Sequence, residues 1–351
     1  INSRSPTFRT SGIRNDCRGY QRMELRAGLI GLGMMGKNHA RVMASTDNVT
    51  LVGIADPIGD STGTIDESLL TASVEELINR RIDLAVVACP TIEHERVALQ
   101  LCEAGIHTLV EKPLAIDSGS AKRIATAFDK ASLVGAVGHI ERFNPAIRSM
   151  RERIGAGELG DLYQISTRRI GPFPNRIQDV GVVKDLATHD LDLTTWVGAA
   201  NFSYISAQTA HKAGRAHEDL VAITGLLKNN VVTNHLVNWL SPVKERFTVA
   251  TGEKGSLVAD TLLADLTFHK NANAPTPWEG ISRFRGVAEG DMIRFAIAKP
   301  EPLRTEFEGF RDTVLEIGGE IVPMSDGVIA VENAERVLES ASFQEKVRIQ
   351  K

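Results

Sequence analysis

Three glycines near the start of the chain restrict its fold more than any other feature. Gly31, Gly33 and Gly36 follow a short apolar run and precede a helical pattern, so they form G-x-G-x-x-G between a strand and a helix. In a dinucleotide-binding loop the first glycine permits a tight turn, the second lets backbone N–H groups approach a pyrophosphate, and the third lets helix and strand pack closely. An ordinary glycine turn would fit the motif alone. Its position predicts a dinucleotide site that includes Met34 and Met35.

A second apolar run ends in a carboxylate that suits the same ligand. Leu51–Asp56 is typical of a buried strand, and Asp56 lies twenty residues after Gly36. That is close to the spacing expected for the carboxylate that binds the ribose hydroxyls of the cofactor. The following residues, Pro57–Gly59, include no Arg or Lys that would bind a ribose 2′-phosphate. The sequence therefore predicts NAD rather than NADP as the cofactor.

Strands and helices alternate from Leu25 to Gly138, and the run Leu84–Ala88 is continuously apolar, like a strand buried on both faces. This pattern predicts a Rossmann domain over residues 23–138, with a doubly wound parallel sheet. Residues 1–22 are basic, rich in Ser, Arg and Gly, and lack the apolar stretch of a secretory signal. We expect a disordered extension there, with a transit peptide or a misplaced start as alternatives.

The pattern changes after Gly138. Several strand-like runs follow one another between Ser203 and Lys270 without long helices, which predicts an antiparallel sheet. A helix is predicted over Val182–Val197, and two closing helices over residues 302–318 and 327–340. The expected fold is therefore α/β followed by α+β. Residues 139–351 would form a substrate-binding and oligomerisation domain with an open, mainly antiparallel sheet.

One face of such a sheet is expected to remain exposed unless another layer packs on it. Val232, Leu236, Trp239 and Leu240 supply apolar side chains for it, and an open sheet face of this kind needs a partner layer. We therefore expect a homodimer or homotetramer formed through this sheet.

Composition excludes several classes of partner. The net charge of −4 gives no general attraction to nucleic acid or to an anionic membrane, and no apolar run approaches the length of a membrane span. Cys17, Cys89 and Cys102 show no disulfide pattern, so we expect free thiols in a cytoplasmic protein. The nine histidines show no metal spacing with cysteine, so no metal is expected.

Two further stretches carry residues suited to catalysis. Lys112 of Glu111–Pro113 follows a parallel strand at its carboxyl end, where ligands of open α/β sheets bind. A lysine there can polarise a substrate hydroxyl, although a solvated surface lysine fits equally. Asp185, His189 and Asp192 are spaced to lie near one face of a helix, so the Asp185 carboxylate can orient the His189 imidazole. A satisfied polar pair on a helix is the alternative.

These motifs together resemble the Gfo/Idh/MocA family (glucose–fructose oxidoreductase and inositol dehydrogenase) over nearly all of Leu25–Ser340. The resemblance rests on GLGMMG, on Asp56, on ACPTIEH at 88–94, on EKP at 111–113 and on DLATHDLD at 185–192. It implies that Lys112, Asp185 and His189 line the substrate site beside the nicotinamide. His189 would take the hydroxyl proton and Lys112 would polarise the same oxygen, while hydride passes to the nicotinamide.

Cofactor contacts are also expected beyond the glycine loop. These candidates are Pro90, Thr91, His94, Glu111 and Lys112. For His94, as for His139, a structural role is the first interpretation.

A narrower resemblance is carried by VGHIERFNPAI (137–147) and RRIGPFPNRIQDVGVVKDLATHD (168–190). Both are similar to the branch that oxidises the 3-hydroxyl of UDP-N-acetylglucosamine or of its uronic acid. A guanidinium pairs bidentately with phosphate and also suits a carboxylate. The expected substrate contacts are Arg142, Asn144, Arg168, Arg176 and His189. Arg168 and Arg169 are neighbours on a strand, so at most one of them faces the site.

Two rival functions stay open. One is an inositol or free-sugar dehydrogenase of the same family. The other is a ligand-sensing regulator that binds NAD without catalysis. A regulator has no need for both Lys112 and His189, so their presence favours an enzyme.

Overall fold

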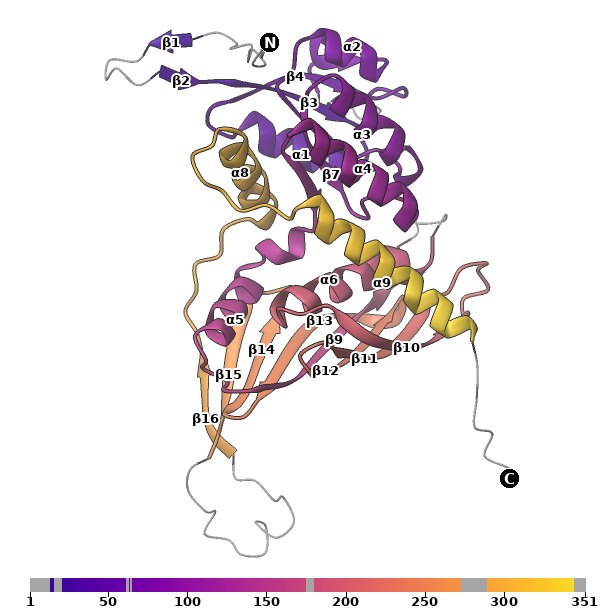
Figure 1. Ribbon diagram of the computed structural model, residues 1–351, viewed down its shortest axis with the longest axis vertical. Helices are drawn as coiled ribbons and strands as arrows, with labels where there is room; N and C mark the ends of the chain where they lie inside the picture. The colour runs from indigo at the N-terminus through magenta and orange to yellow at the C-terminus, as the bar shows by residue number, and fades with distance from the viewer. Residues whose placement is uncertain are drawn as a thin grey trace, which may run out of the picture. The chain divides into compact units, whose positions relative to one another are not determined.

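The computed structural model describes residues 13–15, 21–60, 63, 65–174, 180–272 and 289–343. The chain divides into two compact units, one of Ile1–Gly138 with Leu303–Ser325 and one of His139–Pro302 with Asp326–Lys351. Figure 1 labels most of their helices and strands. Each unit has its own sheet, so the two are described in turn.

The first unit is built on a six-stranded sheet of the predicted kind. Its strand order is β5-β4-β3-β6-β7-β8, and every neighbouring pair is parallel. This is the strand order of a Rossmann sheet, which confirms the predicted fold class. The strands are β3 (Leu25–Ile30), β4 (Val49–Ala55), β5 (Leu70–Thr71), β6 (Leu84–Val87), β7 (His107–Glu111) and β8 (Gly135–Gly138).

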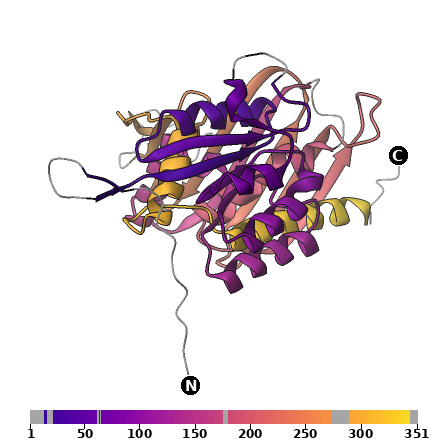
Figure 2. The same ribbon diagram turned by 90° about the horizontal axis from the view of Figure 1, so that it is seen from above.

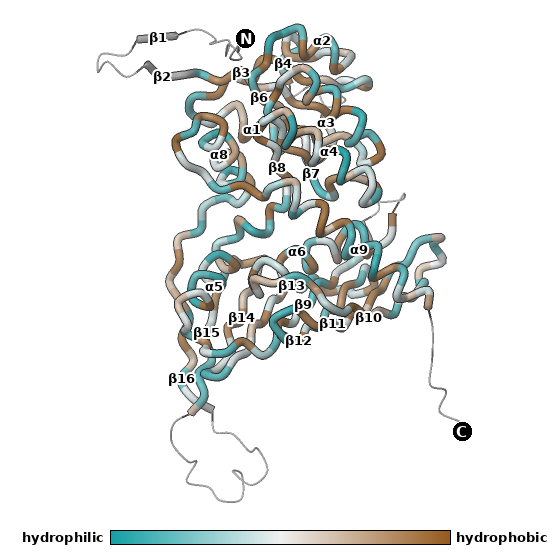
Figure 3. Tube along the Cα trace, in the orientation of Figure 1, coloured by the Kyte–Doolittle hydropathy of each residue, from teal (hydrophilic) through white to brown (hydrophobic). Residues whose placement is uncertain are grey.

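Helices lie along both faces of this sheet, as the view from above shows (Figure 2). Its central strands are therefore apolar along most of their length (Figure 3), and Leu29, Val86 and Val110 are fully buried. The helices of this unit are α1 (Met34–Ala44), η1 (Glu67–Leu69), α2 (Val74–Asn79), η2 (Thr91–Glu93), α3 (His94–Glu103), α4 (Ser118–Ala131) and α8 (Pro302–Val314).

Two of these helices begin where the sequence places polar caps. Ser73 accepts a hydrogen bond from the Glu76 N–H at 3.2 Å at the start of α2. Asp117 accepts one from the Ser120 N–H at 2.7 Å at the start of α4. Both bonds satisfy N–H groups that have no acceptor within the first helical turn.

The domain division differs from the prediction, which placed all of residues 139–351 in the second domain. Leu303–Ser325 belongs to the first unit. Phe307 and Phe310 of α8 are fully buried, and the Val137 N–H of β8 donates to the Val322 carbonyl at 2.9 Å. The returning segment thus buries its apolar side and adds a backbone contact to the last strand of the parallel sheet.

The extension before β3 is only partly described. β1 (Ile13–Asn15) and β2 (Gln21–Met23) pair as an antiparallel ladder, so the prediction of disorder is wrong for those residues, whose backbones pair with each other. Residues 1–12 and 16–20, to which the prediction also applies, lie outside the described residues.

The second unit contains an eight-stranded sheet in the order β10-β11-β12-β9-β13-β14-β15-β16. Its neighbouring pairs are antiparallel except for β12 with β9, which confirms a mainly antiparallel sheet. The strands are β9 (Leu162–Pro172), β10 (Phe202–Ala210), β11 (Leu220–Leu227), β12 (Val232–Asn238), β13 (Leu240–Gly252), β14 (Gly255–Asp260), β15 (Asp265–Asn271) and β16 (Glu289–Arg294).

Helices pack on one face of this sheet (Figure 1). Ile165, Val237, Ala250 and Leu257 point to that face and belong to the buried core. The helical segments of the unit are η3 (Ile140–Phe143), α5 (Pro145–Gly155), η4 (Val183–Ala187), α6 (Thr188–Val197) and α9 (Met324–Ser342). None of the helices formed by the described residues is both long and apolar enough to cross a membrane.

The other face of the sheet carries three of the four apolar residues expected there. Val232, Leu236 and Leu240 are exposed, with exposed fractions of 50%, 36% and 39%. The prediction is wrong for Trp239, which is buried because its ring packs edge-on against Phe173 at 5.4 Å between centroids.

Candidate active site

The glycine loop after β3 has the geometry that its sequence predicts. Gly31 has a φ of +91°, and a Cβ on it would lie 2.6 Å from the Ala88 carbonyl oxygen, so a side chain is excluded. A Cβ on Gly36 would collide with the Gly31 carbonyl oxygen, whereas one on Gly33 would meet nothing within 4 Å. The first and third glycines are thus required by packing inside the protein, and the second leaves open space in front of the backbone.

The start of α1 suits a phosphate. Gly33 is its N-cap and contributes no side chain to satisfy the first-turn N–H groups, which include those of Met34 and Met35. Such N–H groups carry partial positive charge and are a common binding place for a pyrophosphate. The residues of this loop therefore fit a dinucleotide.

Asp56 is fixed beside this loop. One carboxylate oxygen accepts the Leu32 N–H at 2.7 Å and the other accepts the Ile58 N–H at 2.8 Å. Each oxygen keeps a second lone pair, and the side chain is half-buried rather than enclosed. The carboxylate can thus still accept hydrogen bonds from two ribose hydroxyls.

The residues after β6 divide into two groups. Pro90 is exposed and Thr91 half-buried at the carboxyl edge of the sheet, where a cofactor can reach them. His94 is buried, with Nδ1 3.0 Å from the Pro113 carbonyl and Nε2 3.0 Å from the Cys89 carbonyl. The ring of His94 is thus enclosed between two backbone carbonyls, which agrees with the structural role given as its first interpretation and does not fit a cofactor contact through the ring. Burial also raises the pKa of Cys89 to about 11, so its thiol stays protonated at neutral pH.

Glu111 lies inside the protein next to Lys112. Its Oε1 is 2.8 Å from His39 Nε2 on α1, and its Oε2 accepts the Lys112 N–H at 3.1 Å. Burial alone would raise the pKa of Glu111, but the hydrogen bond and charge of His39 and the Lys112 contacts lower it. Glu111 is thus not available to the cofactor as expected, because its carboxylate is used to hold the backbone of Lys112.

Glu306 of α8 is a buried acid that the sequence interpretation missed. Burial raises its pKa well above the ordinary value, and the nearby Glu111 carboxylate raises it further. The signal was present in the sequence, because Glu306 occupies an apolar position of an amphipathic pattern with Leu303, Phe307 and Phe310.

The helix that carries Asp185 and His189 begins with a π-turn. The predicted helix over Val182–Val197 is split into η4, a π-helix, and α6, and the Thr188 N–H donates to the Val183 carbonyl five residues earlier. Because a π-turn holds more residues than an α-turn, Asp185 and His189 are less than one turn apart. π-Turns inside helices are frequent at functional sites.

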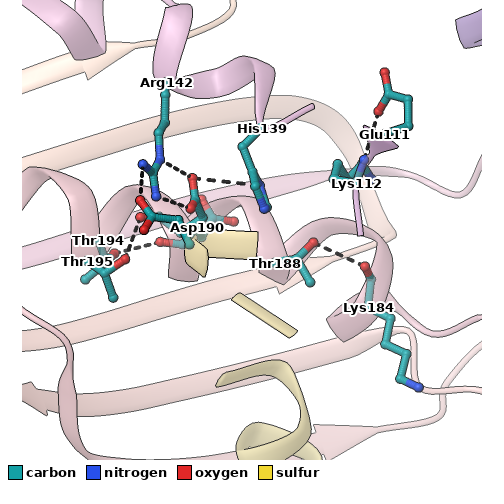
Figure 4. A network of polar contacts seen from close by, with 11 residues as sticks. Glu111, Lys112, His139, Arg142, Lys184, Thr188, Asp190, Thr194 and Thr195 are labelled. Atoms are coloured by element: carbon teal, nitrogen blue, oxygen red, sulfur yellow. Dashed lines mark hydrogen bonds and ion pairs between the residues drawn. The ribbon is translucent and has the colours of Figure 1, made fainter. Parts of the chain in front are cut away.

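Two buried ion pairs fix α6 to its surroundings. Arg169 of β9 donates from Nε to Asp190 at 2.9 Å and from Nη1 to Glu141 at 2.7 Å. Arg142 of η3 donates to both oxygens of Asp192, at 2.9 and 2.5 Å (Figure 4). Asp190 and Asp192 flank Leu191, so both anchors act on the turn that follows His189.

Arg142 is therefore not a substrate-binding residue. It is buried, and its third hydrogen bond goes to Asp326 at 2.7 Å. His139 Nδ1 lies 3.8 Å from the same Asp192 carboxylate (Figure 4). With two carboxylates already bound, the guanidinium of Arg142 has no edge left for a phosphate.

The remaining predicted substrate contacts also need correction. Asn144 caps α5 by accepting the Ala146 N–H at 3.0 Å and donates to the Thr261 carbonyl at 2.9 Å, so its amide is used structurally. Arg168 is exposed and pairs with Glu245 at 2.9 Å, whereas its neighbour Arg169 points to the face that carries α6. Arg168 thus lies on the wrong face of the sheet. Arg176 lies outside the described residues.

Two family models match this chain in order. The first, the oxidoreductase family with an NAD-binding Rossmann fold (GFO_IDH_MocA), matches residues 25–139, and the second, the GFO/IDH/MocA C-terminal domain, matches residues 147–258. The chain belongs to the Gfo/Idh/MocA oxidoreductase family. Its first unit is thus an NAD-binding Rossmann domain, as the glycine loop and Asp56 predict.

Relatives within the Gfo/Idh/MocA family include dehydrogenases of sugars and of polyols. UDP-N-acetylglucosamine 3-dehydrogenase from Acidithiobacillus ferrooxidans is 34% identical over 175 residues, which are 49% of this chain and 54% of that protein. The aligned segment thus spans about half of this curated relative. Inositol 2-dehydrogenase 2 from Saccharopolyspora erythraea is 27% identical over 282 residues, 78% of this chain and 81% of that protein.

A solved structure of the UDP-N-acetylglucosamine 3-dehydrogenase from Acidithiobacillus ferrooxidans has a similar fold over a longer stretch. It matches with a TM-score of 0.78 at 26% identity and covers 90% of this chain and 97% of that chain.

Proposed function

We propose that this protein is an NAD-dependent dehydrogenase that oxidises a sugar hydroxyl, namely the 3-hydroxyl of a UDP-N-acetylhexosamine or of its uronic acid. The observation that carries the nucleotide sugar is the 34% identity to the UDP-N-acetylglucosamine 3-dehydrogenase. The second candidate is an inositol or free-sugar dehydrogenase, which the longer alignment with the inositol 2-dehydrogenase favours. A regulator without catalysis is less favoured, since it would not need both Lys112 and His189.

The residues of this chain take distinct roles in the proposed reaction. His189 accepts the hydroxyl proton, and Asp185 stabilises the resulting imidazolium. Lys112 donates a hydrogen bond to the same substrate oxygen, and Glu111 positions it through the Lys112 N–H. When bound, NAD supplies the hydride acceptor, so the alcohol loses one proton and one hydride and becomes a carbonyl.

Two ion pairs support the role given to His189. Because Arg169 and Arg142 bind Asp190 and Asp192, the turn after His189 is fixed by charge-assisted hydrogen bonds. A general base must be held within hydrogen-bond reach of the proton that it takes, and a fixed helix provides this.

The proposal includes an assembly and a location. We propose a homodimer or homotetramer that buries the exposed sheet face around Val232 and Leu236, in the cytoplasm. Exposed apolar side chains on a sheet face are typical of a subunit interface.

The experiment that tests the proposed function is a turnover assay with NAD and four substrates: UDP-N-acetylglucosamine, its uronic acid, myo-inositol and glucose. We expect turnover of a UDP-sugar, and a loss of about 10²–10⁴-fold in both Lys112→Met and His189→Ala. NAD binding by both variants should stay within about threefold of wild type, since neither change removes the glycine loop. Equal catalytic efficiency on UDP-sugars and on inositol would reject the nucleotide sugar, and active variants would reject the assigned roles.

A further inference from the structure

Of the predicted substrate cations, Arg142 is bound to Asp192 and Asp326, and Arg168 lies on the other face of the sheet. An acidic sugar nevertheless needs cations near His189. A different basic group stands on the face of the second sheet that carries α6. Arg246 of β13 is paired directly with Arg169 of β9 across the ladder. Residues opposed in this way project to the same face of a sheet, so Arg246 lies on the α6 side.

Arg246 is only partly neutralised. Its Nη1 lies 3.6 Å from Glu141, but that carboxylate is already bound by Arg169 at 2.7 Å. The Arg246 side chain keeps 23% of its surface exposed, against 3% for Arg169. Arg169 is thus a buried structural cation, whereas Arg246 shares its partner and still reaches solvent.

Lys244 adds a second cation at the same place. The ladder between β9 and β13 is irregular between Leu240 and Glu245, and Lys244 packs over Gly171 of β9. A Cβ on Gly171 would lie 3.6 Å from the Lys244 Cγ. Lys244 is exposed, and the ion pairs found among the described residues include none to its ammonium.

The charges around these cations do not cancel locally. The pKa of Lys244 is lowered, chiefly by the charge of Arg246 and then by burial and by the charge of Arg169, while Glu141 opposes them. The two arginine contributions show that positive charge is in excess around Lys244. Burial and the Arg169 charge lower the pKa of Arg246 in the same way, although Glu141, Asp190 and Asp185 oppose them.

Asp185 links this group to the proposed reaction. It is one of the carboxylates whose charge acts on Arg246, and it belongs to the π-turn directly before α6. The cations therefore lie on the side of the second unit that carries the Asp185–His189 motif.

We propose that Lys244 and Arg246 form an anion-binding site for the substrate, which takes the anionic oxygens of a phosphoryl group or of a uronic-acid carboxylate. This inference rests on the proposed function, since it names the residues that recognise the acidic part of that substrate. An anion placed there would complete the charge balance that Glu141 provides only in part. Lys244 would contribute a mobile point charge and Arg246 a planar pair of donors.

The test is a direct binding measurement, which does not depend on turnover. Full-length protein loaded with NADH is titrated calorimetrically with UDP as the phosphate source, with glucuronate as the carboxylate source, and with N-acetylglucosamine as a neutral sugar. Lys244→Gln and Arg246→Gln are compared with Lys254→Gln, which removes a lysine just beyond the other end of β13. Circular dichroism and NADH affinity check that each variant is folded.

We expect UDP or glucuronate to bind about 10–100-fold more weakly to Lys244→Gln and Arg246→Gln, as for the loss of one charge-assisted contact. Lys254→Gln and the neutral sugar should show no such change. Loss of UDP affinity alone identifies the phosphoryl group, and loss of glucuronate affinity alone identifies the carboxylate. The site is refuted if wild type binds neither anion, or if all three variants bind as wild type does.

The same titration separates this inference from the proposed function. A protein that oxidises none of the four substrates but loses anion affinity in Lys244→Gln would reject the dehydrogenase assignment and keep the anion site. A protein that oxidises a UDP-sugar with an unchanged Michaelis constant in Lys244→Gln would keep the dehydrogenase assignment and reject the anion site.

Discussion

Replacing Arg142 distinguishes a structural cation from a substrate-binding one. In Arg142→Met the Asp192 carboxylate loses hydrogen bonds of 2.9 and 2.5 Å while it stays 2% exposed. Removing one partner of a buried ion pair costs about 3–5 kcal/mol, because an uncompensated charge is left inside the protein. For a unit of this size that loss lowers the melting temperature by about 6–20 °C.

The assay pairs thermal unfolding with kinetics at a temperature where the variant is folded. We expect a large drop in melting temperature and a Michaelis constant for the sugar within about twofold of wild type, because Arg142 makes no substrate contact. Asp326→Asn is the matched control. It removes the partner that is 33% exposed, so it should cost less than about 1 kcal/mol.

A double variant tests the cause of the loss. Arg142→Met with Asp192→Leu removes both charges and should recover part of the stability, since an apolar pair often replaces a buried ion pair without loss. An unchanged melting temperature together with a tenfold higher Michaelis constant would refute the structural role of Arg142 and restore it to the substrate site.

Three further predictions concern the cofactor, the assembly and a buried acid. Asp56→Ala should reduce the preference for NAD over NADP at least about tenfold in kinetic titrations, since the carboxylate binds the ribose diol and repels a 2′-phosphate; a wild type that prefers NADP would reject this assignment. Light scattering at micromolar concentration should give a dimer or tetramer, and Leu236→Asp should shift it toward monomer, whereas a monomeric wild type would reject the sheet interface. Burial raises the folded-state pKa of Glu306, so the wild type should lose about 1.4 kcal/mol of stability per pH unit as pH rises from the unfolded-state pKa to the folded-state pKa. Glu306→Gln should remove that slope in urea unfolding at several pH values, and identical slopes would show that Glu306 ionises freely.

The Rossmann unit and its glycine loop can be recognised from the amino-acid sequence alone. The spacing of Gly31, Gly33 and Gly36 after a strand fixes where the loop turns, and Asp56 follows at the end of the next strand. These features depend on contacts close in sequence and on strand alternation, so they can be recognised without a structure. The Lys112 and Asp185–His189 motifs were found in the same way, and their roles stay predictions.

Which partner each basic or polar residue binds depends on long-range contacts in the folded protein. Arg142 meets Asp192 across 50 residues of sequence and Asp326 across 184, so nothing in its neighbourhood reveals that its guanidinium is occupied. Arg168 and Arg169 differ by one position, and only the burial of one sheet face assigns them opposite roles. Charged side chains take their partners from whichever chain segments the fold brings near, and the sequence pattern fixes only the type of charge.

Contacts between distant parts of the chain also explain two other features, namely the return of Leu303–Ser325 to the first unit and the grouping of Lys244 with Arg246. In both, the deciding contacts lie between segments far apart in sequence, such as Val137 with Val322 and Arg169 with Arg246. Local patterns predict which helices and strands form, because they depend on neighbouring residues. Which side chains then share a surface is set by burial and pairing over the whole chain, and that information exists only in the folded protein.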